Sequence, residues 1–218
     1  MITYTEATPI LGPLDTSVDE SADYIVRHTR GEYTDHDIRG VIVPRYLALS
    51  IAVGLRPRAV IAMLCIESDE LSSALSQRKD KDGRDLRNPA GIGVYESKSK
   101  ATPHFRSGCV WDADVKGYRP ACQFKTWVDD AIPAHVGRVL AYATHPTVRT
   151  PIQRALVQKA MSYRILPIEC HGSAPILLLF GKGPNTVPNC GWAGGSEHEG
   201  ADYGAHIARV ANAIAGLK

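Results

Sequence analysis

Hydrophobic residues recur at helical spacing along much of the chain, and this pattern predicts a mainly helical protein. The first helix begins after Thr16 or Ser17, residues of the type that caps helix N-termini, and Gly54 ends the second in the usual C-terminal position. Pro44 is placed to break or kink the second helix. The expected helices are residues 17–30, 35–55, 57–71, 127–143, 153–163 and 203–217.

The helix that Pro57 opens carries a glutamate on an otherwise apolar face. The residues on this face are Val60, Met63, Leu64, Glu67 and Leu71. A carboxyl group among such neighbours loses hydration, which favours its protonated form and raises its pKa. A proton donor to a glycosidic oxygen needs this environment. The alternative is a partly exposed glutamate at a helix end, paired with an arginine.

Between the helices, residues 91–124 are rich in Gly, Ser, Pro and aromatic residues, which indicates loops and short strands. A hairpin is expected from residues 110–114, a turn at Lys116-Gly117, and a second strand in 118–124. No repeat or linker divides the chain. We therefore expect one α+β domain over residues 1–218, predominantly helical with a small β-hairpin lobe, and with residues 1–15 as an extended N-terminal arm.

Composition and charge narrow the classes of protein. Hydrophobic residues make up 44% and charged residues 22% of the 218 residues, which is typical of a soluble globular protein. The net charge of +2 is too even for a nucleic-acid partner. The longest apolar runs, Val60–Ile66 and Ala174–Phe180, are far shorter than the roughly 20 residues of a membrane span. The N-terminus lacks the basic start and apolar run of a secretion signal, so we expect synthesis in the cytoplasm.

The five cysteines include no closely spaced pair of the kind that binds zinc, so neither a metal nor another cofactor is expected. Cys109 and Cys122 flank the expected hairpin and could form a pair. For most of the five, however, free buried thiols are the favoured interpretation.

Four groups of motifs occur in order along the chain. They are Cys65–Ser73, Arg87–Val94, Phe124–Trp127 with Ala131–Arg138, and Gly191–Ala193 with Asp202–Gly204. Together they resemble glycoside hydrolase family 73, the endo-β-N-acetylglucosaminidases, and especially the versions found in phage lysins and bacterial cell-wall hydrolases. The resemblance runs from about Thr8 to the C-terminus.

The resemblance implies a lysozyme-like α+β fold with a cleft, in which Glu67 is the general acid. It also implies that residues 88–92 form a cleft wall, where Asn88 and main-chain groups hold the N-acetyl group of a sugar. The alternative is that residues 88–92 simply form a tight turn, which Asn, Pro and Gly favour. The expected substrate-binding residues are Asn88, Ile92, Trp111, Trp192 and Tyr203.

The sequence departs from the family pattern in two places. Ser68-Asp69-Glu70 follows Glu67 where relatives carry a small pair such as Thr-Gly, and Trp192 stands where many relatives have tyrosine. Trp192 could stack on a sugar ring or serve as a core residue that lines the cleft.

A second catalytic carboxylate is expected in the hairpin. Asp112 matches the family best and Asp114 is the second candidate, because alternation along a strand places both on one face. The alternative is that both are solvated residues of the hairpin tip. The acid would activate water, stabilise the transition state or form a covalent bond, and a substrate-assisted route through the acetamido group is also open.

The resulting prediction is a monomeric peptidoglycan hydrolase that cleaves the β-1,4 bond after N-acetylglucosamine, as a phage endolysin made in the cytoplasm and acting on the wall. Trp127, His135 and Arg138 are interpreted as packing that supports the cleft. The alternatives are a lysozyme-type muramidase, a non-catalytic wall-binding module, and a cysteine peptidase that uses Cys65 or Cys170 with His171.

Overall fold

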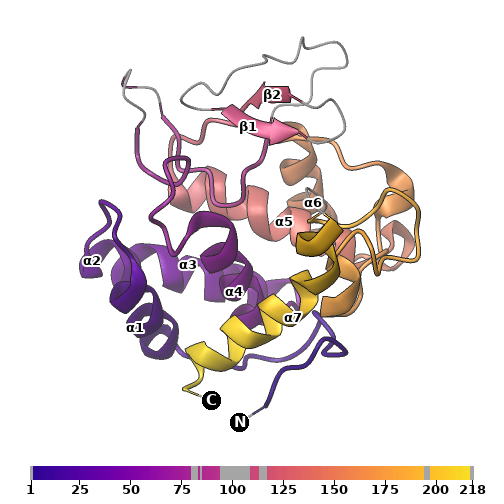
Figure 1. Cartoon of the computed structure of the whole chain (residues 1–218), viewed down its shortest axis with the longest axis horizontal. Helices are drawn as coiled ribbons and strands as arrows, with labels where there is room; N and C mark the ends of the chain where they lie inside the picture. The colour runs from indigo at the N-terminus through magenta and orange to yellow at the C-terminus, as the bar shows by residue number, and fades with distance from the viewer. Residues whose placement is uncertain are drawn as a thin grey trace.

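The described part of the chain forms a body of helices with one short antiparallel strand pair (Figure 1). The computed structural model describes residues 2–79, 83, 85–93, 109–112, 117–193 and 197–216, with backbone alone for 109–112, 117–120 and 197–201. The predicted predominance of helices is confirmed. The α-helices are α1 (Val18–His28), α2 (Asp35–Asp37), α3 (Val43–Ala52), α4 (Pro57–Ser68), α5 (Ile132–Ala143), α6 (Pro151–Tyr163) and α7 (Glu197–Ile214).

Helix α4 forms the centre of the core. Every residue from Pro57 to Cys65 is buried, so the helix is enclosed on all sides rather than along a single apolar face. α7 packs against α4, α3 contacts both α4 and α5, and α5 packs against α6. Figure 1 shows α7 in yellow crossing α4, with the two termini close together at the lower edge.

Two π-helical turns absorb prolines that would otherwise interrupt helices. The π-helix η1 (Ile38–Ile42) leads into α3 and places Pro44 in the first turn of that helix. The π-helix η2 (Trp127–Ala131) leads into α5 and places Pro133 in the same position. The helical backbone continues through Pro44, so the expected break is absent. The π-helical turn directly before Pro44 is a local departure from α-helical geometry of the kind that accompanies a kink.

Among the helix bounds that differ from the prediction, the end of α4 and the start of α7 concern the predicted site residues. α4 ends at Ser68, whose hydroxyl donates to the Leu64 carbonyl (2.6 Å) and accepts from the Leu71 N–H (2.9 Å). Asp69, Glu70 and Leu71 then take left-handed φ angles of 50°, 48° and 66°. Leu71 is thus buried but lies outside the helix. α7 begins at Glu197, before the expected start at Tyr203, so the Asp202–Gly204 motif is inside the helix.

Two short strands lie in the region where the hairpin was expected, and Gly117, expected in the turn, is the first residue of the second strand. β1 (Cys109–Asp112) and β2 (Gly117–Pro120) pair antiparallel, with Trp111 opposite Tyr118. The chain after β2 then runs beside residues 86–93. Three contacts join these segments: the bridge between Gly93 and Ala121, the bond from Cys122 N–H to the Ile92 carbonyl (2.7 Å), and the bond from Phe124 N–H to the Leu86 carbonyl (3.0 Å).

The N-terminal residues lie against the helical body. Pro9 bridges Ile176, and Leu11 bridges Leu55. The side-chain amide of Asn212 in α7 accepts from the Tyr4 N–H (2.8 Å) and donates to the Tyr4 carbonyl (3.0 Å). These contacts fix the arm to α7 and to the start of α4.

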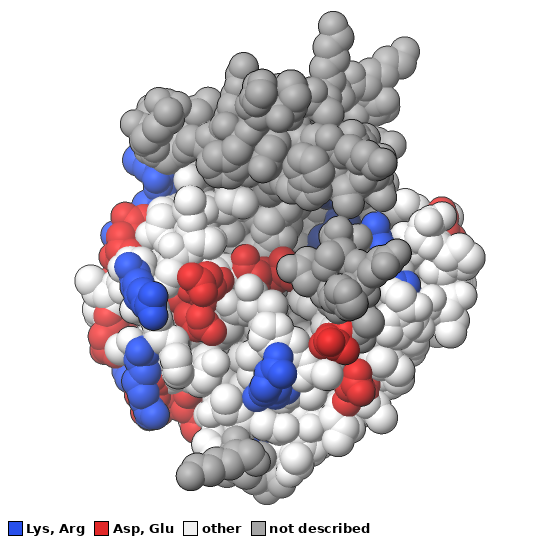
Figure 2. All heavy atoms as spheres, in the orientation of Figure 1, with Lys and Arg blue, Asp and Glu red and all other residues white. Residues whose placement is uncertain are grey.

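Charged side chains of both signs are interspersed over the part of the surface formed by α1 and α2 (Figure 2). Arg39 is the centre of this network, with ion pairs to Asp19 (2.8 Å), Asp23 (2.6 Å) and Asp35 (3.3 Å). Such exposed pairs contribute little to stability. None of the helices in the described ranges is both long and apolar enough to cross a membrane.

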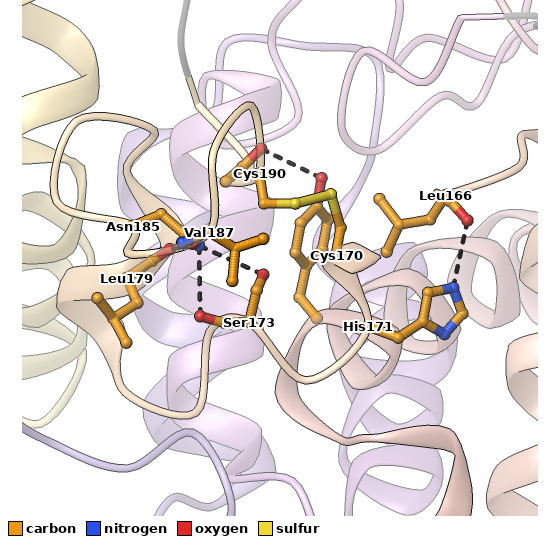
Figure 3. The surroundings of a disulfide bond; sticks show 10 residues. Leu166, Cys170, His171, Ser173, Leu179, Asn185, Val187 and Cys190 are labelled. Carbon is orange, nitrogen blue, oxygen red and sulfur yellow. Dashed lines mark hydrogen bonds between the residues drawn. A yellow bond between two sulfur atoms is a disulfide. The ribbon is translucent and has the colours of Figure 1, made fainter. Parts of the chain in front are cut away.

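A disulfide joins Cys170 to Cys190, with the Cα atoms 5.2 Å apart. Figure 3 shows the loop that it closes, in which the Asn185 amide donates to the Ser173 and Leu179 carbonyls. The possible Cys109–Cys122 pair is wrong, because Cys122 is a free thiol and the strand register places Cys109 opposite Pro120. The free-thiol interpretation holds for Cys65 and Cys122, which are both buried, and fails for Cys170 and Cys190.

Removing this disulfide will destabilise the protein. The two cysteines are 20 residues apart, and closing a loop of that length restricts the unfolded chain by about 3 kcal/mol. We expect the Cys170→Ala/Cys190→Ala double variant to lose on the order of that free energy of unfolding, measured by urea denaturation. A Cys122→Ala variant is the control. Equal stability of the double variant and the wild type would contradict the prediction.

Candidate active site

Glu67 lies in the last turn of α4, where its half-buried carboxyl group meets two donors from distant parts of the chain. The indole Nε1–H of Trp192 donates to Glu67 Oε1 at 3.0 Å. The hydroxyl of Tyr203 in α7 donates to the same oxygen at 2.5 Å. The structure thus brings together three of the residues that the sequence predicted for the site.

Tyr203 is a persistent donor. Its ring is buried against α4, and burial, followed by the adjacent Glu67 carboxylate, raises the pKa of the phenol well above its ordinary value. Both causes disfavour a phenolate beside a carboxylate. Tyr203 therefore keeps its proton, and its hydrogen bond to Glu67, throughout the physiological pH range.

Trp192 is held by its backbone and by its ring. The Trp192 N–H donates to the Phe180 carbonyl at 2.6 Å, within the region where Gly181 and Ala193 form a parallel bridge. Its indole faces α5, with ring centroids 5.4 Å from His135 and 5.9 Å from Tyr142. The indole is thus enclosed between α5 and Glu67.

His135 and Arg138 support this indole from the interior. The Tyr46 hydroxyl lies 2.9 Å from Nδ1 of His135, and burial lowers the pKa of His135 to about 3, so the imidazole is neutral near pH 7. The Arg138 guanidinium lies 6.0 Å from the Trp192 ring centroid, and burial also lowers the pKa of Arg138. Trp127, the first residue of η2, is buried, and its ring lies edge-on to that of Tyr33. This geometry fits a supporting role for all three predicted packing residues.

The surroundings of Glu67 differ from the apolar face that the sequence suggested. The Glu67 side chain is half-buried, but its Oε1 accepts hydrogen bonds from two polar groups, those of Trp192 and Tyr203. Since Oε1 accepts both bonds, a proton carried by Glu67 resides on Oε2. The two donors also stabilise the negative charge that appears on Glu67 once this proton has left. The arrangement is suited to general acid catalysis.

Asn88 and Ile92 shape the turn that was expected to hold a sugar. The Asn88 amide donates to the Ile92 carbonyl (2.8 Å) and the Cys122 carbonyl (3.2 Å). Its oxygen accepts from the N–H groups of Ala90 (3.3 Å) and Ile92 (2.9 Å). Asn88 is 1% exposed, and these four bonds use its polar atoms. A contact between this amide and a sugar would have to break them.

The other predicted site residues lie at or beyond the edge of the described structure. Trp111 and Asp112 belong to β1, where Asp112 pairs with Gly117, and their side chains are outside the described part. Asp114 lies outside the described residues altogether. The presence of a second acid close to Glu67 therefore stays a prediction.

The structure removes the cysteine-peptidase alternative. Cys170 is in the disulfide, and burial raises the pKa of Cys65 well above its ordinary value, which disfavours the nucleophilic thiolate. His171 has a structural environment, in which Nδ1 is 2.8 Å from the Arg149 guanidinium and Nε2 is 3.3 Å from the Leu166 carbonyl (Figure 3 shows the latter contact). Within the described ranges, no three His, Cys, Asp or Glu residues are grouped as metal ligands.

The comparisons with known proteins found likeness in structure alone. No protein-family model matches the sequence, and no curated protein sequence matches it. Two crystal structures of autolysin E from S. aureus each align with 99% of this chain and 74% of theirs, at a TM-score of 0.48. One, in complex with a muropeptide, is 10% identical; the other, a catalytic mutant in complex with the disaccharide NAG-NAM, is 13% identical. At this level of likeness, the function of the chain must be argued from its own residues.

Sequence reasoning missed Tyr142, whose hydroxyl donates to the Gly191 carbonyl at 3.1 Å immediately before Trp192. A signal was present in the sequence, because His135, Arg138 and Tyr142 are three and seven residues apart and so share one face of a helix. Without the fold, nothing indicated that this face meets the tryptophan of the site.

His135 will make stability depend on pH. The unfolded chain binds a proton at an ordinary histidine pKa of about 6.5, whereas the folded protein binds it only near pH 3, so stability falls as the pH falls below 6.5. Between pH 7.5 and 5 we expect a loss on the order of 2 kcal/mol that the His135→Gln variant lacks. Urea denaturation at both pH values measures it, with exposed His28→Gln as control. The same slope in wild type and His135→Gln would contradict the prediction.

Proposed function

We propose that this protein is a peptidoglycan hydrolase that cleaves the glycan strand after N-acetylglucosamine, with Glu67 as the general acid. The observation that carries the proposal is the half-buried Glu67 carboxyl, whose Oε1 accepts from both Trp192 and Tyr203. The resemblance of the sequence motifs to those of glycoside hydrolase family 73 supports the same residue and suggests the substrate class.

In this mechanism, Glu67 transfers the proton on Oε2 to the glycosidic oxygen as the bond between that oxygen and the anomeric carbon breaks. The sugar ring acquires positive charge, and Glu67 becomes a carboxylate. The Trp192 N–H and the Tyr203 hydroxyl are already directed at Oε1, so they stabilise that carboxylate without rearrangement. Water then adds to the anomeric carbon and gives up a proton to a carboxylate, either the second acid of the proposal or Glu67 itself, which completes hydrolysis.

The second acid of the proposal is Asp112, with Asp114 as the alternative. A carboxylate here would activate the water or stabilise the positively charged ring, and a separation of about 6.5–9.5 Å from Glu67 would leave room for that water. If neither acts, the acetamido group of the substrate is the remaining nucleophile.

In this proposal, the protein is a monomeric phage endolysin that acts on the bacterial cell wall. The Cys170–Cys190 disulfide supports action outside the cytoplasm, because disulfides persist in oxidising compartments. A muramidase would use the same acid on the alternate bond, so only the products distinguish the two. A wall-binding module would bind without cleaving.

Digestion of purified peptidoglycan tests the function directly. We expect wild type to release fragments that, after borohydride reduction, carry reduced N-acetylglucosamine ends in mass spectra. Glu67→Gln cannot donate a proton, so we expect its rate to fall by a factor of about 10²–10⁴ with wall binding unchanged.

Glu70→Gln is the matched control, because Glu70 is also a half-buried carboxyl and lies three residues farther on. Its rate is expected to stay within a few-fold of wild type. Reduced muramic acid ends would make the protein a muramidase. Wall binding with no cleavage by wild type would overturn the enzymatic proposal.

Substitution in the hairpin tests the second acid. We expect Asp112→Asn to lower turnover by about 10²-fold, and Asp114→Asn to leave it within a few-fold, when both are assayed on the same peptidoglycan. The reverse order would assign the role to Asp114. Near-normal turnover in both variants would overturn the two-carboxylate mechanism and favour the substrate-assisted route.

A further inference from the structure

The tripeptide Cys190-Gly191-Trp192 is fixed at each residue. Cys190 is 1% exposed and bonded to Cys170. Gly191 has φ +123° and lies so close to the chain that an added Cβ would be 2.7 Å from Lys182 Cα. Trp192 is held through its backbone by Phe180 and through its indole by Glu67. Each residue of this segment outside regular secondary structure is thus fixed by a contact with another part of the chain.

Tyr142 of α5 contacts this tripeptide twice. Its hydroxyl donates to the Gly191 carbonyl at 3.1 Å, and its ring lies 5.9 Å from that of Trp192. The first contact fixes the peptide that precedes Trp192, and the second limits the tilt of the indole. Both act on the orientation of the Nε1–H that Glu67 accepts.

We infer that Tyr142 is a positioning residue for the reaction, acting on Glu67 through Trp192. This inference rests on the proposed function for its effect on the rate, and on geometry alone for its effect on the indole. Tyr142 is 4% exposed, so it does not reach the substrate. Its hydroxyl sets the direction of the Trp192 N–H, and that N–H sets the orientation of the Glu67 carboxyl group.

The mechanism predicts a specific kinetic effect. Tyr142→Phe removes one hydroxyl and keeps the ring, so Trp192 gains freedom while the packing of the ring is kept. We expect kcat to fall about 3- to 10-fold, the effect of one neutral hydrogen bond, with KM unchanged. In a Trp192→Phe background, Tyr142→Phe should have no further effect on kcat, because the residue through which it acts is absent.

Tyr33→Phe is a matched control for the loss of a buried hydroxyl. Tyr33 is 5% exposed and donates to the Ser76 carbonyl at 2.7 Å, so it has the burial and the kind of acceptor that Tyr142 has. Both variants should lower the melting temperature by similar amounts. Only Tyr142→Phe should lower kcat. An equal fall of kcat in both variants would overturn the inference.

A measurement that needs no activity separates this inference from the proposed function. The protein has three tryptophans, so a nitrogen–proton NMR spectrum contains three indole signals, and the signal missing in Trp192→Phe is that of Trp192. We expect Glu67→Gln and Tyr142→Phe to shift this signal toward weaker hydrogen bonding, and Tyr33→Phe to leave it in place.

An unchanged signal and unchanged kcat in Tyr142→Phe would overturn the positioning role. A shifted signal in a wild-type background that cleaves no glycan would support the positioning of Trp192 by Tyr142 and overturn the proposed function instead.

Discussion

The double hydrogen bond to Glu67 Oε1 is the interaction on which the site depends. A carboxyl group at the end of a buried helix has lost part of its hydration, and its charged form is tolerated only where donors replace the missing water. Trp192 and Tyr203 are those donors, one from a loop and one from α7. The same two bonds that compensate burial also join three segments of the fold at one atom.

Several contacts around Trp192 fix the position of its indole. Trp192 follows a disulfide and a glycine whose position excludes any side chain, and its ring rests on α5. His135 is neutral in this setting, because burial lowers its pKa, so it packs against the indole without bringing a charge close to Glu67. Helix α5 therefore supports a loop residue, and packing against regular elements of this kind fixes the orientation of a side chain on a loop.

The sequence predicted the helices well because their apolar spacing is a local signal. It predicted Glu67, Trp192 and Tyr203 through motif resemblance, and their meeting at one oxygen could not be read from spacing, since they come from three separate segments. The Cys170–Cys190 disulfide was missed because a pairing across a loop has no local pattern. The fully internal bonding of Asn88 likewise depends on the approach of residue 122, a contact made only in the folded chain.

The end of α4 shows how local strain and access to the site are linked. Three consecutive residues without glycine, Asp69 to Leu71, occupy the left-handed region at a cost of about 1–2 kcal/mol each. Ser68 stabilises this turn through Leu64 and Leu71, and the Ser72 hydroxyl accepts from the Arg30 N–H at 2.7 Å. The chain is thereby directed away from the helix axis immediately after Glu67. The helix thus ends one residue after Glu67, whose side chain is half-buried, and this partial exposure is compatible with the role of proton donor proposed for it.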